Sequence, residues 1–196
     1  MAIEIKENVP LASLTTFGIG GGAKYLTEVK TDVELREAII WARDRITSFH
    51  ILSGGSNVLI PDEGLRGLVI RIVSDSYVFN GLNLIADAGC NLTMLIREAG
   101  RRGLGGWESL AGIPGSIGGA IRGNAGAFGS ELKDYTFAVR AYNHETGELR
   151  TFVNEACHFA YRSSYFKQHF EWIILNVEVA LREIGPQESA EGHHAA

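Results

Sequence analysis

Two glycine-rich loops contain the residues best suited to hold an anion. Residues 53–57 read Ser-Gly-Gly-Ser-Asn between two apolar stretches, so the turn offers several backbone N–H groups, and Ser56 and Asn57 add side-chain donors. Taken alone, this pentapeptide is better explained as an ordinary tight turn. It is not a Walker A loop, because no Gly-Lys-Ser/Thr follows, and it lacks the dinucleotide-binding Gly-x-Gly-x-x-Gly pattern.

The second loop, residues 111–119, reads Ala-Gly-Ile-Pro-Gly-Ser-Ile-Gly-Gly. Pro114 ends any preceding helix, and the residues after it can begin a new one, whose N-terminus beside exposed glycine backbone suits a diphosphate. Close packing of a helix explains the same glycines equally well. Two loops suited to anions in one chain favour a phosphate-bearing ligand over coincidence.

The second loop belongs to the most glycine-rich stretch of the chain, residues 103–129, which holds 10 of the 24 glycines. The residues between these glycines are mostly apolar, whereas a flexible linker would be polar. We therefore expect an ordered, buried loop whose backbone takes positive φ or comes close to a ligand.

Polar side chains at Asn124 and in residues 161–165 could also contact a ligand. Asn124 follows Gly123, and its amide could bond either a ligand or its own turn. Residues 161–165 read Tyr-Arg-Ser-Ser-Tyr. Arg162 could hold an anion through its planar guanidinium, although an isolated arginine more often forms a surface ion pair.

The elements that must position these residues fall into two groups. Residues 1–74 alternate predicted strands with one helix, expected over residues 32–44 and beginning with a capping box formed by Thr31 and Glu34. Strand, helix, strand, loop and strand in this order indicate a small α/β subdomain.

Residues 75–184 are expected to be α+β with an antiparallel sheet. Asn80-Gly81 predicts a tight hairpin, and Asn91 is a candidate N-cap for the helix that follows it. Residues 172–181 alternate apolar and polar side chains, which is typical of a strand.

Composition narrows the class of protein. The formal net charge of −5 argues against nucleic acid as the main partner, and no apolar run is long enough to span a membrane. A cytoplasmic protein is expected. The histidines lack metal-ligand spacing, so no metal is expected, and Cys90 and Cys157 are interpreted as two buried thiols. Residues 185–196 are small and polar and are expected to be a flexible tail.

Several stretches together resemble the UDP-N-acetylenolpyruvoylglucosamine reductase family (MurB-like). The matching stretches, in family order, are residues 15–21, 53–59, 110–120, 124–129 and 161–163. The resemblance covers nearly all residues from about 10 to about 182. It implies an FAD-binding fold of the vanillyl-alcohol-oxidase (PCMH) type, with a small α/β subdomain, residues 1–74, and a second subdomain, residues 75–184, with an antiparallel sheet and helices.

The resemblance implies FAD as cofactor and NADPH as hydride donor. The residues implied to bind the cofactor are Ser53, Gly54, Gly55, Ser56, Asn57, Val58, Leu59, Leu110, Ala111, Gly112, Ile113, Pro114, Gly115, Ser116, Gly118, Gly119, Asn124 and Gly126. The two loops would hold the diphosphate and ribityl chain, with Asn124 and Gly126 near the flavin or adenine.

The family reaction, a step of peptidoglycan synthesis, passes hydride from NADPH through flavin to the enolpyruvyl double bond of a UDP-sugar. Arg162 matches the family arginine that stabilises the developing enolate, and Tyr161 is implied to bind the substrate with it. A fixed guanidinium offsets negative charge that develops at the substrate carboxyl group.

The chain departs from the family pattern in three ways. Ser53 replaces a more usual glycine, and Phe128 replaces a more usual tyrosine. The family continues into a C-terminal substrate domain with a proton-donating serine and an assisting glutamate, and residues 183–196 resemble none of it. Flavin binding is therefore expected with an incomplete reaction, and self-association or a partner chain is expected to cover the exposed apolar surface.

Two alternatives remain open to the sequence. The chain could be a non-catalytic flavin- or nucleotide-binding module that needs a partner chain for turnover. It could also be an empty scaffold whose glycine loops are structural relics.

Overall fold

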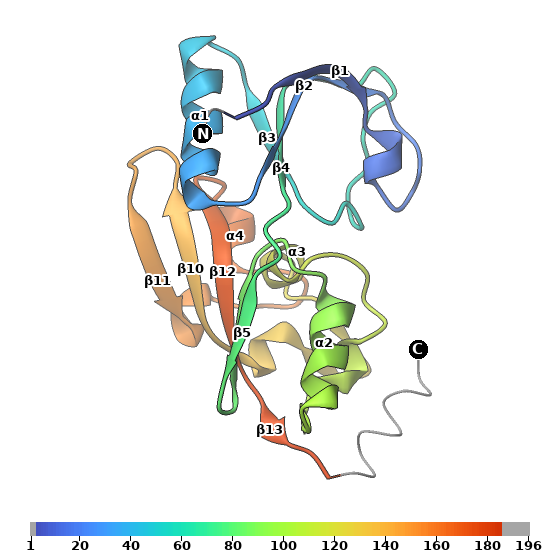
Figure 1. The fold of residues 1–196 in the computed structure, drawn as a ribbon, viewed down its shortest axis with the longest axis vertical. Helices are drawn as coiled ribbons and strands as arrows, with labels where there is room; N and C mark the ends of the chain where they lie inside the picture. The colour runs from blue at the N-terminus through green and yellow to red at the C-terminus, as the bar shows by residue number, and fades with distance from the viewer. Residues whose placement is uncertain (1–2, 186–196) are drawn as a thin grey trace. The chain divides into compact units, whose positions relative to one another are not determined.

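The boundary between the two compact units of the chain lies between Ser74 and Asp75 (Figure 1). The computed structural model describes residues 3–185. The tail expected at residues 185–196 lies outside the described residues except for Gly185. No helix in the described part of the chain is both long and apolar enough to cross a membrane.

The first unit is a four-stranded sheet with one long helix. Its elements are β1 (Lys6–Pro10), the 3-10 turn η1 (Ala12–Leu14), β2 (Gly22–Val29), α1 (Asp32–Asp44), β3 (Phe49–Leu52) and β4 (Leu65–Ile72). The strand order is β1-β2-β4-β3, in which β1 is antiparallel to β2 and the other pairs are parallel. The sequence did not predict β1; the other elements fit the α/β pattern expected here.

Helix α1 begins where the sequence predicts. The Thr31 hydroxyl accepts a hydrogen bond from the Glu34 amide at 3.2 Å, and the Glu34 carboxylate accepts one from the Thr31 amide at 3.2 Å. This reciprocal pair satisfies N–H groups that a helix start leaves without partners. Leu35, Ala38 and Ile39 are buried, as their helical spacing predicts.

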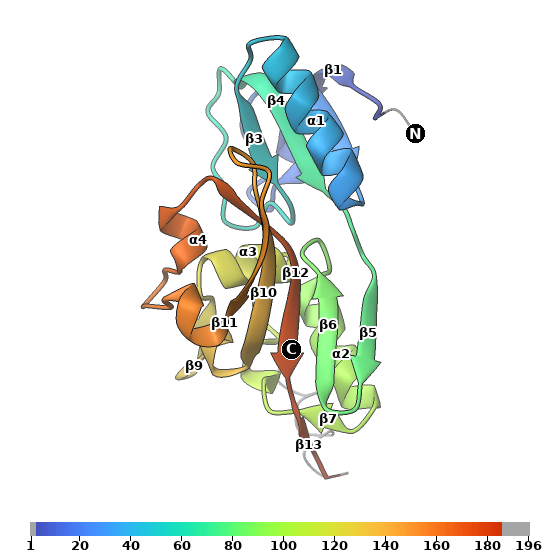
Figure 2. The same ribbon diagram turned by 90° about the vertical axis from the view of Figure 1, so that its left-hand side faces the viewer.

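The second unit is built on a five-stranded antiparallel sheet of order β11-β10-β12-β6-β5 (Figure 2). Its strands are β5 (Tyr77–Asn80), β6 (Asn83–Asp87), β10 (Thr136–Asn143), β11 (Leu149–Val153) and β12 (Trp172–Ala180). Short pairs are added by β7 (Leu104–Gly105) with β13 (Arg182–Glu183), and by β8 (Gly126–Ala127) with β9 (Ser130–Glu131).

The helices of this unit share one core with the sheet. They are α2 (Leu92–Arg101), α3 (Ile117–Arg122) and α4 (Tyr165–Gln168), with 3-10 turns η2 (Glu108–Leu110), η3 (Leu132–Asp134) and η4 (Asn154–Cys157). Phe152, Val139, Val177 and Ala86 lie side by side across four strands and are buried in this core. The α+β fold predicted from the sequence is confirmed.

Candidate functional site

The loop after β3 presents backbone donors that nothing else in the described chain uses. Within residues 3–185, the consecutive N–H groups of Gly54, Gly55, Ser56 and Asn57 donate no hydrogen bond to another part of the chain. The Ser56 hydroxyl bonds the Gly54 carbonyl at 3.3 Å, which stabilises the turn locally. Consecutive free N–H groups in a turn form a concave site for an anion.

This loop is packed against the other glycine-rich turn of the first unit. The Thr16 amide donates to the Gly55 carbonyl at 3.1 Å. Gly55 has φ +65, and a Cβ placed on it would overlap the carbonyl oxygen of Leu14. Only glycine satisfies both constraints, so Gly55 fixes the shape of the loop.

Three large apolar side chains on the two bonded turns of this unit are exposed. Leu59 is 71% exposed, and Phe17 and Ile19, on the turn bonded to Gly55, are 58% and 55% exposed. Large apolar side chains exposed beside polar backbone are typical of ligand sites. An amphiphilic ligand with an anionic centre matches this mixture.

The loop of the second unit, residues 110–119, uses its donors differently. Ser116 caps α3, and the first N–H groups of the helix all find partners: Ile117 bonds Cys90 O, Gly118 bonds Ala88 O, and Gly119 bonds the Ser116 hydroxyl. A Cβ on Gly118 would lie 2.7 Å from the Ala88 Cβ, so close packing requires this glycine. The start of α3 is therefore fully bonded within the chain.

Open positions lie just before and within this helix. A Cβ on Gly112 would meet no atom within 4 Å, and Gly119 is exposed. Among residues 3–185, the amides of Gly112 and Gly115 have no acceptor. These positions leave room for a ligand to approach the backbone.

Arg162 lies at the tip of a very tight turn. The backbone groups of Ala160 and Ser163 bond each other twice, at 3.0 Å each, and leave Tyr161 and Arg162 at the corner. Arg162 has φ +54, and Tyr161 is 82% exposed. The Lys167 ammonium donates to the Arg162 carbonyl at 2.8 Å. The guanidinium is thus presented to solvent from a constrained backbone.

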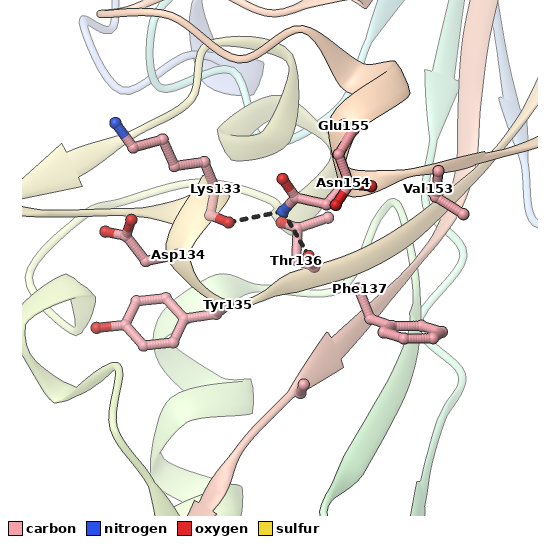
Figure 3. A pocket seen from close by; sticks show the side chains of 9 residues that line it. Lys133, Asp134, Tyr135, Thr136, Phe137, Val153, Asn154 and Glu155 are labelled. Atoms are coloured by element: carbon pink, nitrogen blue, oxygen red, sulfur yellow. Dashed lines mark hydrogen bonds between the residues drawn. The ribbon is translucent and has the colours of Figure 1, made fainter.

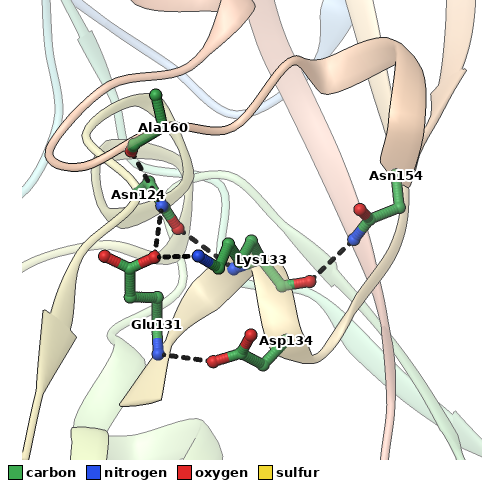
Figure 4. Close-up of polar contacts among 6 residues, drawn as sticks. All are labelled: Asn124, Glu131, Lys133, Asp134, Asn154 and Ala160. Atoms are coloured by element: carbon green, nitrogen blue, oxygen red, sulfur yellow. Dashed lines mark hydrogen bonds and ion pairs between the residues drawn. The ribbon is translucent and has the colours of Figure 1, made fainter. Parts of the chain in front are cut away.

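Asn124 is fully buried, and its amide bonds within the chain (Figure 4). Its Nδ2 group donates to the Ala160 carbonyl at 3.0 Å and to the Glu131 carboxylate at 3.1 Å, and its Oδ1 accepts from the Lys133 amide at 3.1 Å. The sequence left open whether the Asn124 amide bonds a ligand or its own turn. In the structure it bonds its own turn and the turn that carries Arg162.

A pocket of about 310 Å³ lies elsewhere in the second unit (Figure 3). It is lined by Lys133, Asp134, Tyr135, Thr136, Phe137, Val153, Asn154, Glu155 and Ala180. Asn154 donates to the carbonyls of Lys133 and Thr136, at 2.7 and 2.6 Å, and so joins η4 to β10. The sequence did not predict this pocket, and none of the expected site residues lines it.

Comparisons with known proteins identify the family. A family model described as an FAD binding domain matches residues 23–152. The crystal structure of UDP-N-acetylenolpyruvylglucosamine reductase (MurB) from Thermus caldophilus is 34% identical, with a TM-score of 0.80, and the match covers 98% of this chain and 68% of that one. The chain belongs to the MurB family of FAD-binding domains. The resemblance inferred from five sequence stretches is confirmed.

Other relatives of this FAD-binding domain carry the same name. UDP-N-acetylenolpyruvoylglucosamine reductases from Solibacter usitatus and Carboxydothermus hydrogenoformans are 39% and 42% identical over 91% and 87% of the chain. The chain spans 57% of the length of each. A cholesterol oxidase from Brevibacterium sterolicum, 14% identical with a TM-score of 0.64 over 92% of this chain and 38% of that one, shares the fold.

The residues of this FAD-binding domain fit the cofactor that defines the family. The free N–H groups of residues 54–57 match the charge of a diphosphate, and the exposed apolar side chains beside them match flat ring systems. The backbone at Gly112 is also open, because a Cβ built there would meet no atom within 4 Å.

The two thiols of the FAD-binding domain are buried and unpaired, as the sequence predicts. Burial raises the pKa of Cys90 to about 11 and that of Cys157 to about 12. Both remain protonated at neutral pH, so neither is suited to nucleophilic chemistry. No cluster of His, Cys, Asp and Glu suited to a metal ion occurs among the described residues.

Sequence reasoning missed the side chains that support the Arg162 turn. Lys167 bonds the Arg162 carbonyl, and Ser164, directly after the turn, bonds the Arg122 carbonyl. The Glu131 carboxylate and the Lys133 backbone amide bond the side chain of Asn124. None of these residues belongs to a motif with a known spacing. The only available signal was the density of polar residues at 161–165, which marked the segment without naming its partners.

Proposed function

We propose that the chain is the flavin-binding part of a reductase that acts on UDP-N-acetylglucosamine enolpyruvate. The observation that carries the proposal is the row of free N–H groups at residues 54–57 in a chain of the MurB family. The names of the relatives support the substrate class. The chain spans little more than half of their length, so substrate and activity are parts of the proposal.

In this proposal the cofactor is held mainly by backbone. The amides of residues 54–57 bind the diphosphate of FAD, with the side chains of Ser53 and Asn57 beside it, and Val58 and Leu59 border the same loop. In the second unit, the open backbone at Gly112 and Gly115 leaves room for a ligand beside residues 110–119. When bound, FAD supplies two-electron redox chemistry with NADPH as the hydride donor.

In this proposal the turn at residues 160–163, which carries Arg162, binds the substrate. The guanidinium offsets the negative charge that develops at the substrate carboxyl group, and Tyr161 contacts the substrate beside it. The tight turn and the positive φ of Arg162 constrain the backbone from which this side chain extends. By resemblance of its motifs, the chain is assigned to peptidoglycan synthesis in the cytoplasm.

An anaerobic titration with NADPH tests the reductase part of the proposal. The FAD-loaded chain is expected to lose its flavin absorbance band as NADPH is added, because hydride transfer reduces the flavin. Dithionite serves as the control that the bound flavin is reducible. A band that dithionite bleaches and NADPH leaves unchanged would contradict the reductase assignment and leave FAD binding intact.

A second candidate is a flavin-binding module that needs a partner chain. It is favoured by Phe128, Tyr161 and Phe170, aromatic side chains of the second unit that are 94%, 82% and 72% exposed. Self-association would cover the same side chains. Under this reading the NADPH titration leaves the band unchanged until a partner protein is added.

A further inference from the structure

We infer that Asn124 is a positioning residue that holds the turn bearing Arg162 in its active geometry. The inference rests on the proposed function for the role of Arg162. The contact itself is independent of that role, because it joins two segments that lie 36 residues apart in the sequence.

The amide of Asn124 is fully used at this junction. Its Nδ2 group donates one hydrogen bond to the Ala160 carbonyl, at 3.0 Å, and another to the Glu131 carboxylate, at 3.1 Å. Its Oδ1 atom accepts a hydrogen bond from the Lys133 backbone amide. Its side chain is inaccessible to water. A buried amide that loses one partner leaves another polar group unpaired, which makes such junctions costly to disturb.

The turn that Asn124 contacts has little stability of its own. It is closed by only the two backbone bonds between Ala160 and Ser163, and Arg162 at its corner takes φ +54. A residue other than glycine in this region keeps its conformation only where its surroundings impose it. Asn124 itself has φ +42, which asparagine tolerates better than most residues.

Two other side chains bond this segment. The buried Ser164 hydroxyl donates to the Arg122 carbonyl at 2.8 Å, on the α3 side of Asn124. Lys167 reaches the Arg162 carbonyl from an exposed position. Of these three contacts, only that of Asn124 joins a buried side-chain amide to the Ala160 carbonyl, which closes the turn. We therefore assign the positioning of the turn to Asn124.

The charge next to Asn124 explains why an amide is required. Lys133, and then the Asn124 amide itself, lower the pKa of Glu131, so its carboxylate stays ionised at neutral pH. This carboxylate is bound by two donors, the Lys133 ammonium at 2.7 Å and the Asn124 amide at 3.1 Å. An aspartate at position 124 would set a second carboxylate against Glu131 and would also remove the donor to Ala160.

Hydrogen exchange of the Ala160 and Ser163 amides, followed by NMR on the chain without ligand, tests the inference. Asn124→Gly keeps positive φ accessible and removes the amide; Asn124→Asp keeps the shape and the acceptor and removes the donor. The exchange rate at residues 160 and 163 is divided by that of the Val139 amide in the β10 core. This exchange ratio is expected to be about tenfold higher in both variants than in the unaltered chain. If Asn124→Gly does not fold, the exchange of Asn124→Asp alone decides the test.

The matched control is Asn143→Ala. Asn143 is also a buried asparagine of the second unit, and its Oδ1 accepts from the amides of Glu145 and Thr146 in the β10–β11 turn. This variant should leave the exchange ratio at residues 160 and 163 unchanged. Unchanged ratios in the folded Asn124 variants, or an equal rise in the control, would overturn the inference.

Calorimetric binding of UDP-N-acetylglucosamine enolpyruvate to the FAD-loaded chain links the turn to function. Asn124→Asp is expected to weaken binding about tenfold, and Asn143→Ala is expected to leave it unchanged. If the unaltered chain does not bind this compound, the proposed role of Arg162 fails while the exchange result still decides the role of Asn124. If it binds and Asn124→Asp binds equally well, the positioning role is wrong.

Discussion

Gly55→Ala is expected to lower the free energy of unfolding by about 3 kcal/mol and to abolish FAD binding. Two separate effects of the added Cβ lower the stability of the Gly55→Ala variant. A side chain at φ +65 is disfavoured by about 1–2 kcal/mol, and a Cβ overlapping the Leu14 carbonyl forces the two glycine-rich turns apart. The same displacement would misalign the free N–H groups of residues 54–57.

Gly18→Ala separates these two costs. Gly18 has φ +66, almost the same as Gly55, but a Cβ on it would meet no atom within 4 Å. This variant should lose only about 1–2 kcal/mol and keep its affinity for FAD. Denaturant unfolding followed by circular dichroism, with an FAD titration on each protein, makes the comparison. Equal losses of stability in the two variants would show that the contact with Leu14 does not constrain the loop.

Arg162→Ala is expected to slow the oxidation of the reduced FAD-loaded chain by UDP-N-acetylglucosamine enolpyruvate by about 10²–10³-fold. The side chain is the cation at the tip of the Ala160–Ser163 turn, and without it the negative charge on the substrate has no fixed partner. FAD affinity should not change, because no cofactor role is assigned to this side chain. Anaerobic stopped-flow absorbance and an FAD titration measure the two properties.

Arg101→Ala provides the matched control for this charge change. Arg101 is an arginine of α2 whose side chain is 73% exposed, and among residues 3–185 it forms an ion pair only with its helical neighbour Glu98. It should affect neither rate nor FAD affinity. If Arg162→Ala lost flavin affinity as strongly as it lost rate, Arg162 would belong to the cofactor site.

The elements with strong local signals could be predicted from the sequence. The capping box at Thr31 places the start of α1, and Asn91 caps α2 by accepting from the Met94 amide at 2.9 Å. The hairpin predicted at Asn80-Gly81 forms, but its loop lies one residue later: Asn80 pairs with Asn83, and Gly81, at φ +58, and Leu82 make the turn. Each of these features depends on residues within a few positions of one another, and such information is visible in a single sequence.

Features that depend on distant partners could not be predicted. Strand β1 is exposed along most of its length and shows no apolar alternation, so only its pairing with β2 defines it. Close packing of Gly118 on Ala88 requires knowledge of where β6 ends relative to α3. The role of the Asn124 amide depends on Ala160, which a local pattern cannot place beside it.

The two glycine loops illustrate the same limit within the site. Taken alone, the sequence favours an ordinary tight turn at residues 53–57 and explains residues 111–119 equally well by a ligand or by close packing. The structure distinguishes their donors, since the start of α3 is bonded to Ala88 and Cys90 while the amides of residues 54–57 have no acceptor in the described part of the chain. Whether a glycine serves packing or a ligand depends on what lies beside it, and composition does not contain that information.

The visible absorption spectrum of the chain, recorded after incubation with excess FAD and desalting, tests whether the chain binds FAD. We expect a retained flavin band whose peaks are shifted and structured relative to free FAD. The N–H groups at residues 54–57 would hold the diphosphate, and binding would remove the flavin ring from water. A colourless protein after desalting would contradict the claim that these loops bind FAD.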